Sequence, residues 1–230
     1  MYFIHHYSDR NKLMQSLCDE IIKDLRKMLK EKNEVTLAVP GGLTPKPLLE
    51  KLSLIDLEWS RLTIIPTDER CVPESSELSN SGLIRAKLLQ NFASKAKLIS
   101  FYKPNYSVST MASLISDQLT SLLPIDICVL GMGTDMHTAS IFPRSDRLSD
   151  ALDIKSSSNL IPISAPCVDE LRLTLTARVL RDASKLHILI TGAEKKEALD
   201  LAMASKDNWE LSPVRSVLFR DGRVDIHFSF

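Results

Sequence analysis

Short apolar runs alternate along this chain with segments that have the spacing of amphipathic helices, and this alternation constrains the fold most. The apolar runs lie at 35–39, 62–65, 125–130 and 185–191, whereas 11–32 repeats leucine, isoleucine and methionine at three- and four-residue steps. Strands that alternate with helices build right-handed βαβ units. The sequence therefore predicts an α/β fold: a mainly parallel, Rossmann-like sheet with helices on both faces.

The remaining expected elements are shorter, and none of them suggests a domain boundary. Thr44 is expected to cap a helix that has Pro45 at its first position, where a missing N–H has no cost. Further strands are expected at 98–101, 160–163, 171–176 and 224–228, and further helices at 80–91, 108–122 and 193–204. Because the sequence has no internal repeat, low-complexity tract or linker, we expect a single domain over residues 1–230.

Charge and cysteine content exclude several classes of partner. Lys+Arg and Asp+Glu number 29 each, so there is no net basic field to attract nucleic acid or an anionic membrane. No apolar run reaches the roughly 18 residues of a membrane span, and residues 1–10 do not resemble a signal peptide. Cys18, Cys71, Cys128 and Cys167 form no CxxC pair and are expected to be reduced thiols. We expect a cytoplasmic protein, monomeric or weakly homo-oligomeric, without nucleic-acid or membrane partners.

Two loops that follow predicted strands have residues suited to an anionic sugar. Gly41 and Gly42 precede a helix N-terminus, which offers free N–H groups to a phosphate; the alternative is a plain tight turn. In the next loop Arg70 could grip a carboxylate or a phosphate, while Asp68 and Glu69 could orient Arg70 or bind sugar hydroxyls. A solvated charged turn is the alternative there.

A third loop, 131–140, combines glycines with a histidine. His137 titrates near neutrality and can take a proton from water, and Asp135 two residues earlier can fix its orientation. Backbone N–H groups around Gly131 and Gly133 are candidates for stabilising an oxyanion. The alternative is a surface histidine in an ordinary glycine turn.

Cations occur in two further segments. Arg172, Thr174 and Thr176 alternate with leucines, so one face of a strand presents a cation and two hydroxyls. Lys195 or Lys196, after the strand 185–191, could neutralise a phosphate. An exposed strand face and solvated lysines are the alternatives. The five segments occur in sequence order, and four of them directly follow or form strands of one predicted sheet, which favours a common site.

The other histidines suggest no metal site. His5 and His6 lie near the chain start, and His187 and His227 lie within strand patterns. Since no pair has metal-ligand spacing with a third candidate nearby, we expect no required metal.

Taken in order, these motifs resemble the 6-phosphogluconolactonase family. The matching segments are Gly41-Gly42-x-Thr44-Pro45, Asp68-Glu69-Arg70-x-Val72-Pro73 with Ser79-Asn80, Gly131-Met132-Gly133-x-Asp135-x-His137-Thr138-Ala139-Ser140-x-Phe142-Pro143, Arg172-x-Thr174-x-Thr176 and Gly192-x-x-Lys195. The resemblance implies hydrolysis of a phosphorylated sugar lactone in the oxidative pentose phosphate pathway, without a cofactor. It also implies a fold shared with glucosamine-6-phosphate deaminases.

The resemblance assigns roles to individual residues. His137 matches the family's base, with Asp135 beside it, and the expected substrate contacts are Gly41, Gly42, Thr44, Asp68, Arg70, Asn80, Gly131, Gly133, Arg172 and Lys195. One departure is Met136, where the family usually has glycine. A methionine there is strained if the position needs positive φ.

Two other functions are compatible with parts of the pattern. A glucosamine-6-phosphate deaminase would share the fold, but that family has tyrosine at the position of Arg70 and a different segment after its histidine. A non-catalytic sugar-phosphate sensor would be expected to carry a DNA-binding segment. Ammonia release from glucosamine 6-phosphate, or binding of 6-phosphogluconate without turnover, would indicate one or the other.

Overall fold

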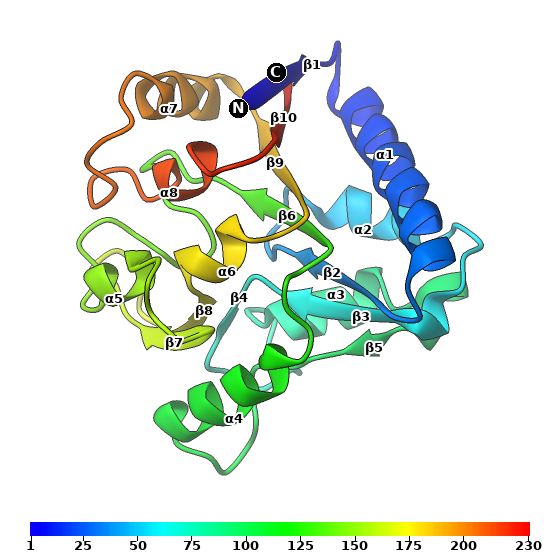
Figure 1. The fold of residues 1–230 in the computed structure, drawn as a ribbon, viewed down its shortest axis with the longest axis horizontal. Coiled ribbons are helices and arrows are strands. Elements are labelled where there is room, and N and C mark those ends of the chain that lie inside the picture. Colours follow the sequence, from blue (N-terminus) through cyan, green and yellow to red (C-terminus); the bar gives the residue numbers. More distant parts are fainter.

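The computed structural model describes residues 1–230, which form two β-sheets with helices around them (Figure 1). The strands are β1 (Tyr2–His6), β2 (Val35–Val39), β3 (Leu62–Pro66), β4 (Asp68–Arg70), β5 (Lys97–Leu98), β6 (Ile127–Gly131), β7 (Leu160–Ile163), β8 (Arg172–Leu175), β9 (Lys185–Thr191) and β10 (Val224–Ser229). The α-helices are α1 (Arg10–Glu31), α2 (Lys46–Ser53), α3 (Asn80–Lys87), α4 (Val108–Thr120), α5 (Leu148–Leu152), α6 (Ala177–Arg181), α7 (Ala193–Met203) and α8 (Arg215–Leu218). Two 3-10 helices lie at Trp59–Arg61 and Asn91–Lys95.

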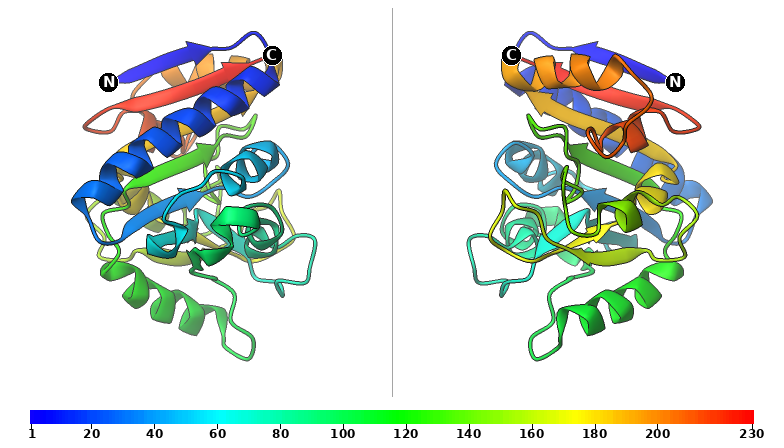
Figure 2. Two further views of the ribbon diagram at one scale, coloured as in Figure 1. Left: turned by 90° about the vertical axis from the view of Figure 1, so that its right-hand side faces the viewer. Right: turned by 90° about the vertical axis from the view of Figure 1, so that its left-hand side faces the viewer.

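The main sheet is parallel throughout and buries both of its faces. Its seven strands run in the order β1-β10-β9-β6-β2-β3-β5. Successive side chains of a strand point to opposite faces, so Ile127 and Val129 of β6 pack with α1, α2 and α3, whereas Cys128 and Leu130 pack with α4 to α8. Figure 2 shows the sheet from its two faces, with α1 in front of it in the left view and α7 in front of it in the right view. The expected α/β class is confirmed.

Helix α1 shows how local sequence sets one of these layers. Asp9 caps its N-terminus by accepting a hydrogen bond from the Lys12 N–H at 2.8 Å. Its buried stripe is Leu13, Met14, Leu17, Cys18, Ile21, Ile22, Leu25 and Leu29, which is the spacing seen in the sequence. The expected helix over 11–32 is thus correct to within a residue. None of the helices combines the length and apolar character that a membrane crossing requires.

The strand order places a crevice between β2 and β6. From β2 the chain proceeds outward through β3 to β5, and from β6 it proceeds in the opposite direction through β9 to β10. The loops after β2 and β6 therefore diverge at their carboxyl ends, which is where ligands bind in open α/β sheets. The glycine loops that begin at Pro40 and Gly131 lie at this point.

The expectation that 171–176 belongs to the main sheet is wrong. The segment forms β8, which pairs antiparallel with β7 and β4 in a separate three-stranded sheet. Asp68–Arg70, expected as a loop, is the strand β4, and Arg70 is directly opposite Arg172. A polar strand of three residues has no apolar pattern to identify it, and its partner is about 100 residues away in the sequence.

Smaller differences concern the ends of elements. Thr44 does not cap α2, because that helix begins at Lys46 and has Pro45 at its cap position without a side-chain bond. The helix expected over 80–91 ends at Lys87. Tyr2–His6, to which no element was assigned, forms the edge strand β1 beside β10.

Candidate active site

A cleft of about 250 Å³ opens at the crevice between β2 and β6. The loops after β2 and β6 line it, together with residues of β4, β8 and β9 and of the first turns of α3 and α7. Every residue predicted to contact substrate is in its wall, along with the predicted base: Gly41, Gly42, Thr44, Asp68, Arg70, Asn80, Gly131, Gly133, His137, Arg172 and Lys195. The walls also include Pro40, Leu43, Pro45, Met132, Ala139 and Leu189, to which the sequence analysis assigned no contact with substrate.

His137 is held in a tight turn by Asp135. Its Nδ1 lies 2.5 Å from Asp135 Oδ1, and its backbone N–H donates to the same oxygen at 3.2 Å. Partial burial raises the pKa of Asp135, but the hydrogen bonds and the charge of His137 outweigh burial and the net shift is downward. A carboxylate on Nδ1 places that proton there and leaves the Nε2 lone pair available. Asp135 is not part of the cleft wall; it contacts the imidazole through Nδ1.

Two neighbours fix the plane of the imidazole. A Cβ on Gly133 would lie 2.2 Å from His137 Nδ1, so only glycine allows the ring to lie across this turn. On another side the Phe142 ring centroid is 4.0 Å from that of His137, at an interplanar angle of 33°. The guanidinium of Arg172 lies over the same phenyl ring, 5.3 Å from its centroid. Phe142 therefore packs against both the base and a cation, a role that its place in the sequence does not indicate.

Met136 has the backbone conformation that the family's usual glycine suggests. Its φ is +63°, and its carbonyl oxygen accepts a hydrogen bond from Val214 N–H at 3.0 Å. A side chain in this left-handed region costs about 1–2 kcal/mol. The side chain packs in turn against the core on the α4 to α8 side of the sheet.

Comparing Met136→Gly with Met136→Ala separates backbone strain from packing. Both variants lose the packed side chain, but only glycine relieves the strain, which is partly offset by its greater freedom in the unfolded chain. We expect the glycine variant to have a free energy of unfolding about 1 kcal/mol higher than the alanine variant. Urea denaturation of the two proteins measures this difference, and an alanine variant as stable as the glycine one would contradict it.

Three cations face the cleft. Arg70 Nη1 donates to the carbonyl oxygen of Leu78 at 2.7 Å and to Asn80 Oδ1 at 2.9 Å. Burial and the nearby charge of Arg70 lower the pKa of Arg172, and burial followed by the charge of Arg10 lowers that of Lys195. The Nε atoms of Arg70 and Arg172 are buried without a hydrogen-bond partner. Three cations in one cleft, two of them with an N–H that has no partner, suit a dianionic group such as a phosphate.

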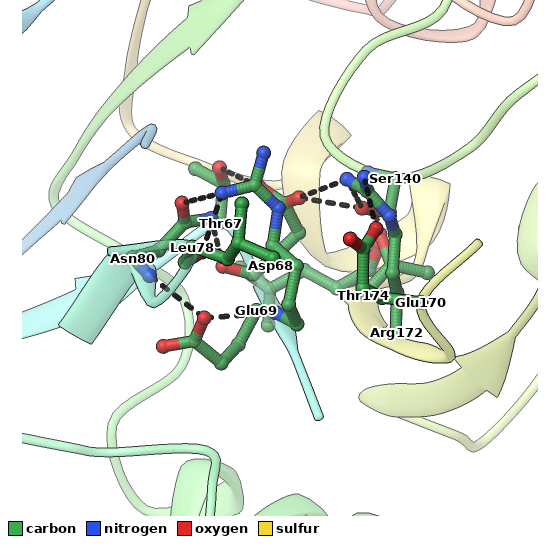
Figure 3. Close-up of polar contacts among 11 residues, drawn as sticks. Thr67, Asp68, Glu69, Leu78, Asn80, Ser140, Glu170, Arg172 and Thr174 are labelled. Carbon is green, nitrogen blue, oxygen red and sulfur yellow. Dashed lines mark hydrogen bonds and ion pairs between the residues drawn. The ribbon is translucent and has the colours of Figure 1, made fainter. Parts of the chain in front are cut away.

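A buried network anchors Arg172 beneath the cleft (Figure 3). Asp68 Oδ2 is 3.9 Å from Arg172 Nη1 and accepts a hydrogen bond from Ser140 Oγ at 2.5 Å. On the other side, Glu170 Oε2 is 3.7 Å from Arg172 Nη2. Thr174 joins this network, because its Oγ1 accepts from the Ser140 N–H at 3.2 Å. Asp68 is thus primarily a partner of Arg172 and Ser140.

Glu69 points away from the cleft, so the expectation that it could bind sugar hydroxyls is wrong. Its carboxylate is fully buried and accepts a hydrogen bond from the backbone N–H of Asn80 at 2.8 Å (Figure 3). The backbone N–H of Ser81 donates to its other oxygen at 2.7 Å. The carboxylate also accepts hydrogen bonds from Ser79 Oγ at 3.2 Å and from the backbone N–H of the next residue, Arg70, at 2.8 Å. Glu69 therefore satisfies the first free N–H groups of α3 and positions Asn80 against Arg70.

Gly133 is not free to act as an oxyanion donor. Its N–H already donates to the carbonyl oxygen of His137 at 3.1 Å, which closes the turn. The expectation that both Gly131 and Gly133 offer backbone N–H groups is therefore wrong for Gly133. Its contribution is the space it leaves for the imidazole.

The remaining histidines are closer together than the sequence suggested. His187 Nδ1 and His227 Nε2 are 3.1 Å apart, and Glu20 Oε2 is 3.8 Å from the latter. Burial lowers the pKa of His187 to about 4 and that of His227 to about 3, so both rings are neutral at pH 7. The argument that no histidine pair has a third ligand nearby is wrong, because the sheet brings together residues far apart in the sequence.

Comparisons with known proteins agree with this fold and site. The family model described as glucosamine-6-phosphate isomerases/6-phosphogluconolactonase matches residues 8–226. The 6-phosphogluconolactonase of Pseudomonas aeruginosa is 42% identical over 205 residues, covering 89% of this chain and 86% of that protein. That of Rhizobium meliloti is 38% identical over 218 residues, covering 94% of each. A crystal structure of a 6-phosphogluconolactonase from Shewanella baltica, 29% identical, superposes with a TM-score of 0.95 over 100% of this chain and 98% of that one.

Proposed function

This chain belongs to the glucosamine-6-phosphate isomerase/6-phosphogluconolactonase family, and we propose that it hydrolyses 6-phospho-D-glucono-1,5-lactone to 6-phospho-D-gluconate in the oxidative pentose phosphate pathway. The observation that carries the proposal is that one cleft holds both a free imidazole edge and three cations. A lactone is a cyclic ester, and its hydrolysis needs a base beside the carbonyl carbon. A phosphate at the other end needs cations.

His137 is the general base in this proposal. Its Nε2 takes a proton from a water molecule, whose oxygen then bonds to the lactone carbonyl carbon and moves the carbonyl electrons onto oxygen. When the carbonyl re-forms, the bond to the ring oxygen breaks, and that oxygen receives the proton from His137. Asp135 stabilises the transient imidazolium and keeps the ring oriented, as its 2.5 Å contact with Nδ1 allows. No step needs a metal or a cofactor.

Arg70, Arg172 and Lys195 are assigned to the phosphate. Holding the far end of the substrate fixes the carbonyl carbon beside His137, so that binding energy is used for orientation. The loop of Gly41 and Gly42 is the proposed second support, since a Cβ at Gly41 would lie only 1.8 Å from Asn80 Oδ1. This close approach leaves backbone at the cleft wall, where a side chain would otherwise occupy the space.

Replacing Arg172 with alanine is expected to raise KM about 10–100-fold and to change kcat less, because charge-assisted hydrogen bonds contribute about 1.5–3 kcal/mol each. Steady-state kinetics with the lactone measures both constants. Arg172→Lys is the matched control: it keeps the charge but loses the planar fork, and an intermediate KM is expected. A folded Arg172→Ala protein with unchanged KM would remove Arg172 from the phosphate site.

Acid release from freshly prepared 6-phosphogluconolactone, followed against the spontaneous rate, tests the proposed activity. Acceleration by the protein is expected, together with no ammonia release from glucosamine 6-phosphate. Ammonia release without lactone hydrolysis would indicate the deaminase instead. Binding of 6-phosphogluconate without any turnover would indicate a sensor. The proposal places the reaction in the cytoplasm, a reducing compartment that suits four free cysteines.

A further inference from the structure

A group of metal-ligand side chains lies between α1 and the sheet, away from the cleft. Glu20 of α1, His187 of β9 and His227 of β10 each offer one ligand atom, and these atoms lie within 4.8 Å of one another. None of the three residues lines the cleft. We propose that they form a second site, which binds one divalent transition-metal cation of the Zn²⁺ class.

The distances are close to those of a tetrahedral zinc site. Zinc–nitrogen bonds of about 2.0–2.1 Å at tetrahedral angles place neighbouring ligand atoms roughly 3.3 Å apart. His187 Nδ1 and His227 Nε2 are 3.1 Å apart, and His227 Nε2 and Glu20 Oε2 are 3.8 Å apart. The Glu20 side chain is 34% exposed, which leaves it room to move toward the two imidazoles. Two imidazoles and one carboxylate leave a fourth position for water.

The hydrogen bonds around the rings also suit a cation. Tyr7 Oη lies 3.0 Å from His227 Nδ1, so that nitrogen can donate to the phenol and leave the Nε2 lone pair directed at His187 and Glu20. His187 Nε2 is buried and has no hydrogen-bond partner. The His187 ring is therefore held only through Nδ1, and it can turn toward a cation without breaking a bond on its other side.

The surrounding charge favours a cation at this place. The Glu20 carboxylate makes no hydrogen bond within the protein, and burial together with the negative charge of Asp225 raises its pKa. Asp225 is already paired with Arg223, at 2.6 Å, and with His5, at 2.7 Å. Asp24 is 3.6 Å from the ammonium of Lys185. Of these three carboxylates Glu20 is the one without a cationic side chain of its own.

Imidazole ligands select the class of metal. Mg²⁺ and Ca²⁺ prefer oxygen ligands, whereas Zn²⁺, Co²⁺ and Ni²⁺ accept two imidazoles and one carboxylate. A bound ion would join α1 to two adjacent strands, since its ligands come from all three elements. It would therefore stabilise the folded state by linkage and raise the melting temperature.

Cobalt(II) titration of the full chain, pretreated with a chelator, tests the proposal. One equivalent should give the visible d–d absorption of tetrahedral Co²⁺, which excess Zn²⁺ should abolish. Zn²⁺ should raise the melting temperature, and Mg²⁺ should not. Glu20→Gln changes a partly exposed side chain without changing its shape, and it should weaken binding at least about 10-fold. His187→Leu should abolish the spectrum.

Two controls exclude other ligands, and the assay needs no substrate, so its outcome is separate from that of the hydrolysis. Cys167→Ser removes the exposed thiol and His137→Asn removes the cleft imidazole; both should bind Co²⁺ as the wild type does. The proposal is overturned if the wild type gives no tetrahedral spectrum. It is also overturned if the spectrum survives Glu20→Gln unchanged, or disappears in either control.

Discussion

A His137→Asn variant is expected to hydrolyse 6-phosphogluconolactone with a kcat about 10²–10⁴-fold below that of the wild type, the usual contribution of a positioned general base. Asparagine has nearly the same reach but cannot accept a proton from water. KM should change little, because Arg70, Arg172 and Lys195, which are proposed to bind the phosphate, remain in the cleft wall. Initial rates corrected for spontaneous hydrolysis give both constants.

The control for this variant is His6→Asn, which removes an exposed imidazole outside the cleft. It should retain full activity. Circular dichroism and melting temperature establish whether both proteins are folded. A folded His137→Asn enzyme with wild-type kcat would show that the base is another group. It would also contradict the proposed role of Asp135 in orienting that base.

Replacing Glu69 with alanine is expected to lower the free energy of unfolding by about 3–5 kcal/mol. The carboxylate accepts from two N–H groups at the start of α3 and from the Ser79 hydroxyl, all of them buried. Alanine would leave these donors without a partner, and each buried orphan costs about 1–3 kcal/mol. Urea denaturation of wild type and variant measures the loss.

Glu77→Ala is the matched control, because Glu77 lies on the same connection but is exposed. Its free energy of unfolding should lie within about 0.5 kcal/mol of the wild-type value. A Glu69→Ala protein as stable as the Glu77→Ala protein would contradict the role assigned to this carboxylate. A loss of stability accompanied by a higher KM would fit the second role, since Glu69 also holds Asn80 against Arg70.

The sequence predicts the cleft well because of one property of parallel sheets. Apolar runs identified the central strands, and the carboxyl ends of parallel strands meet at one edge. The segments at Gly41, Asp68, Gly131 and Gly192 therefore had to be neighbours. Strand β8, which contains Arg172, also borders the cleft, but it belongs to the separate antiparallel sheet. Its sequence pattern does not show to which of the two sheets it belongs.

The orientation of Glu69 could not be predicted while its segment was taken for a loop. In a strand, side chains alternate between faces, so Asp68 and Arg70 share the side of the cleft and Glu69 faces α3. Three residues are too few to show that period. The Ser79-Asn80 pair that follows is the one sequence feature related to the position of Glu69. It marks the start of α3, whose first backbone N–H groups require acceptors.

Contacts between residues far apart in the sequence could not be predicted either. His187 and His227 are 40 positions apart and meet because β9 and β10 are neighbours, which depends on strand order. Phe142 was named only as part of a family motif, and its contact with His137 depends on how the turn folds back. For Met136 the signal was present, since the family's glycine indicated the positive φ that the structure has.

In the proposed binding mode, the cleft binds the phosphate at one end and places the ester carbon beside His137 at the other. The most direct test of this binding mode is the ratio of kcat/KM for 6-phosphogluconolactone to that for unphosphorylated glucono-1,5-lactone, measured on the same enzyme preparation. The account predicts a ratio of at least about 100, since losing two or more charge-assisted hydrogen bonds costs about 3 kcal/mol or more. Equal values for the two lactones would contradict it.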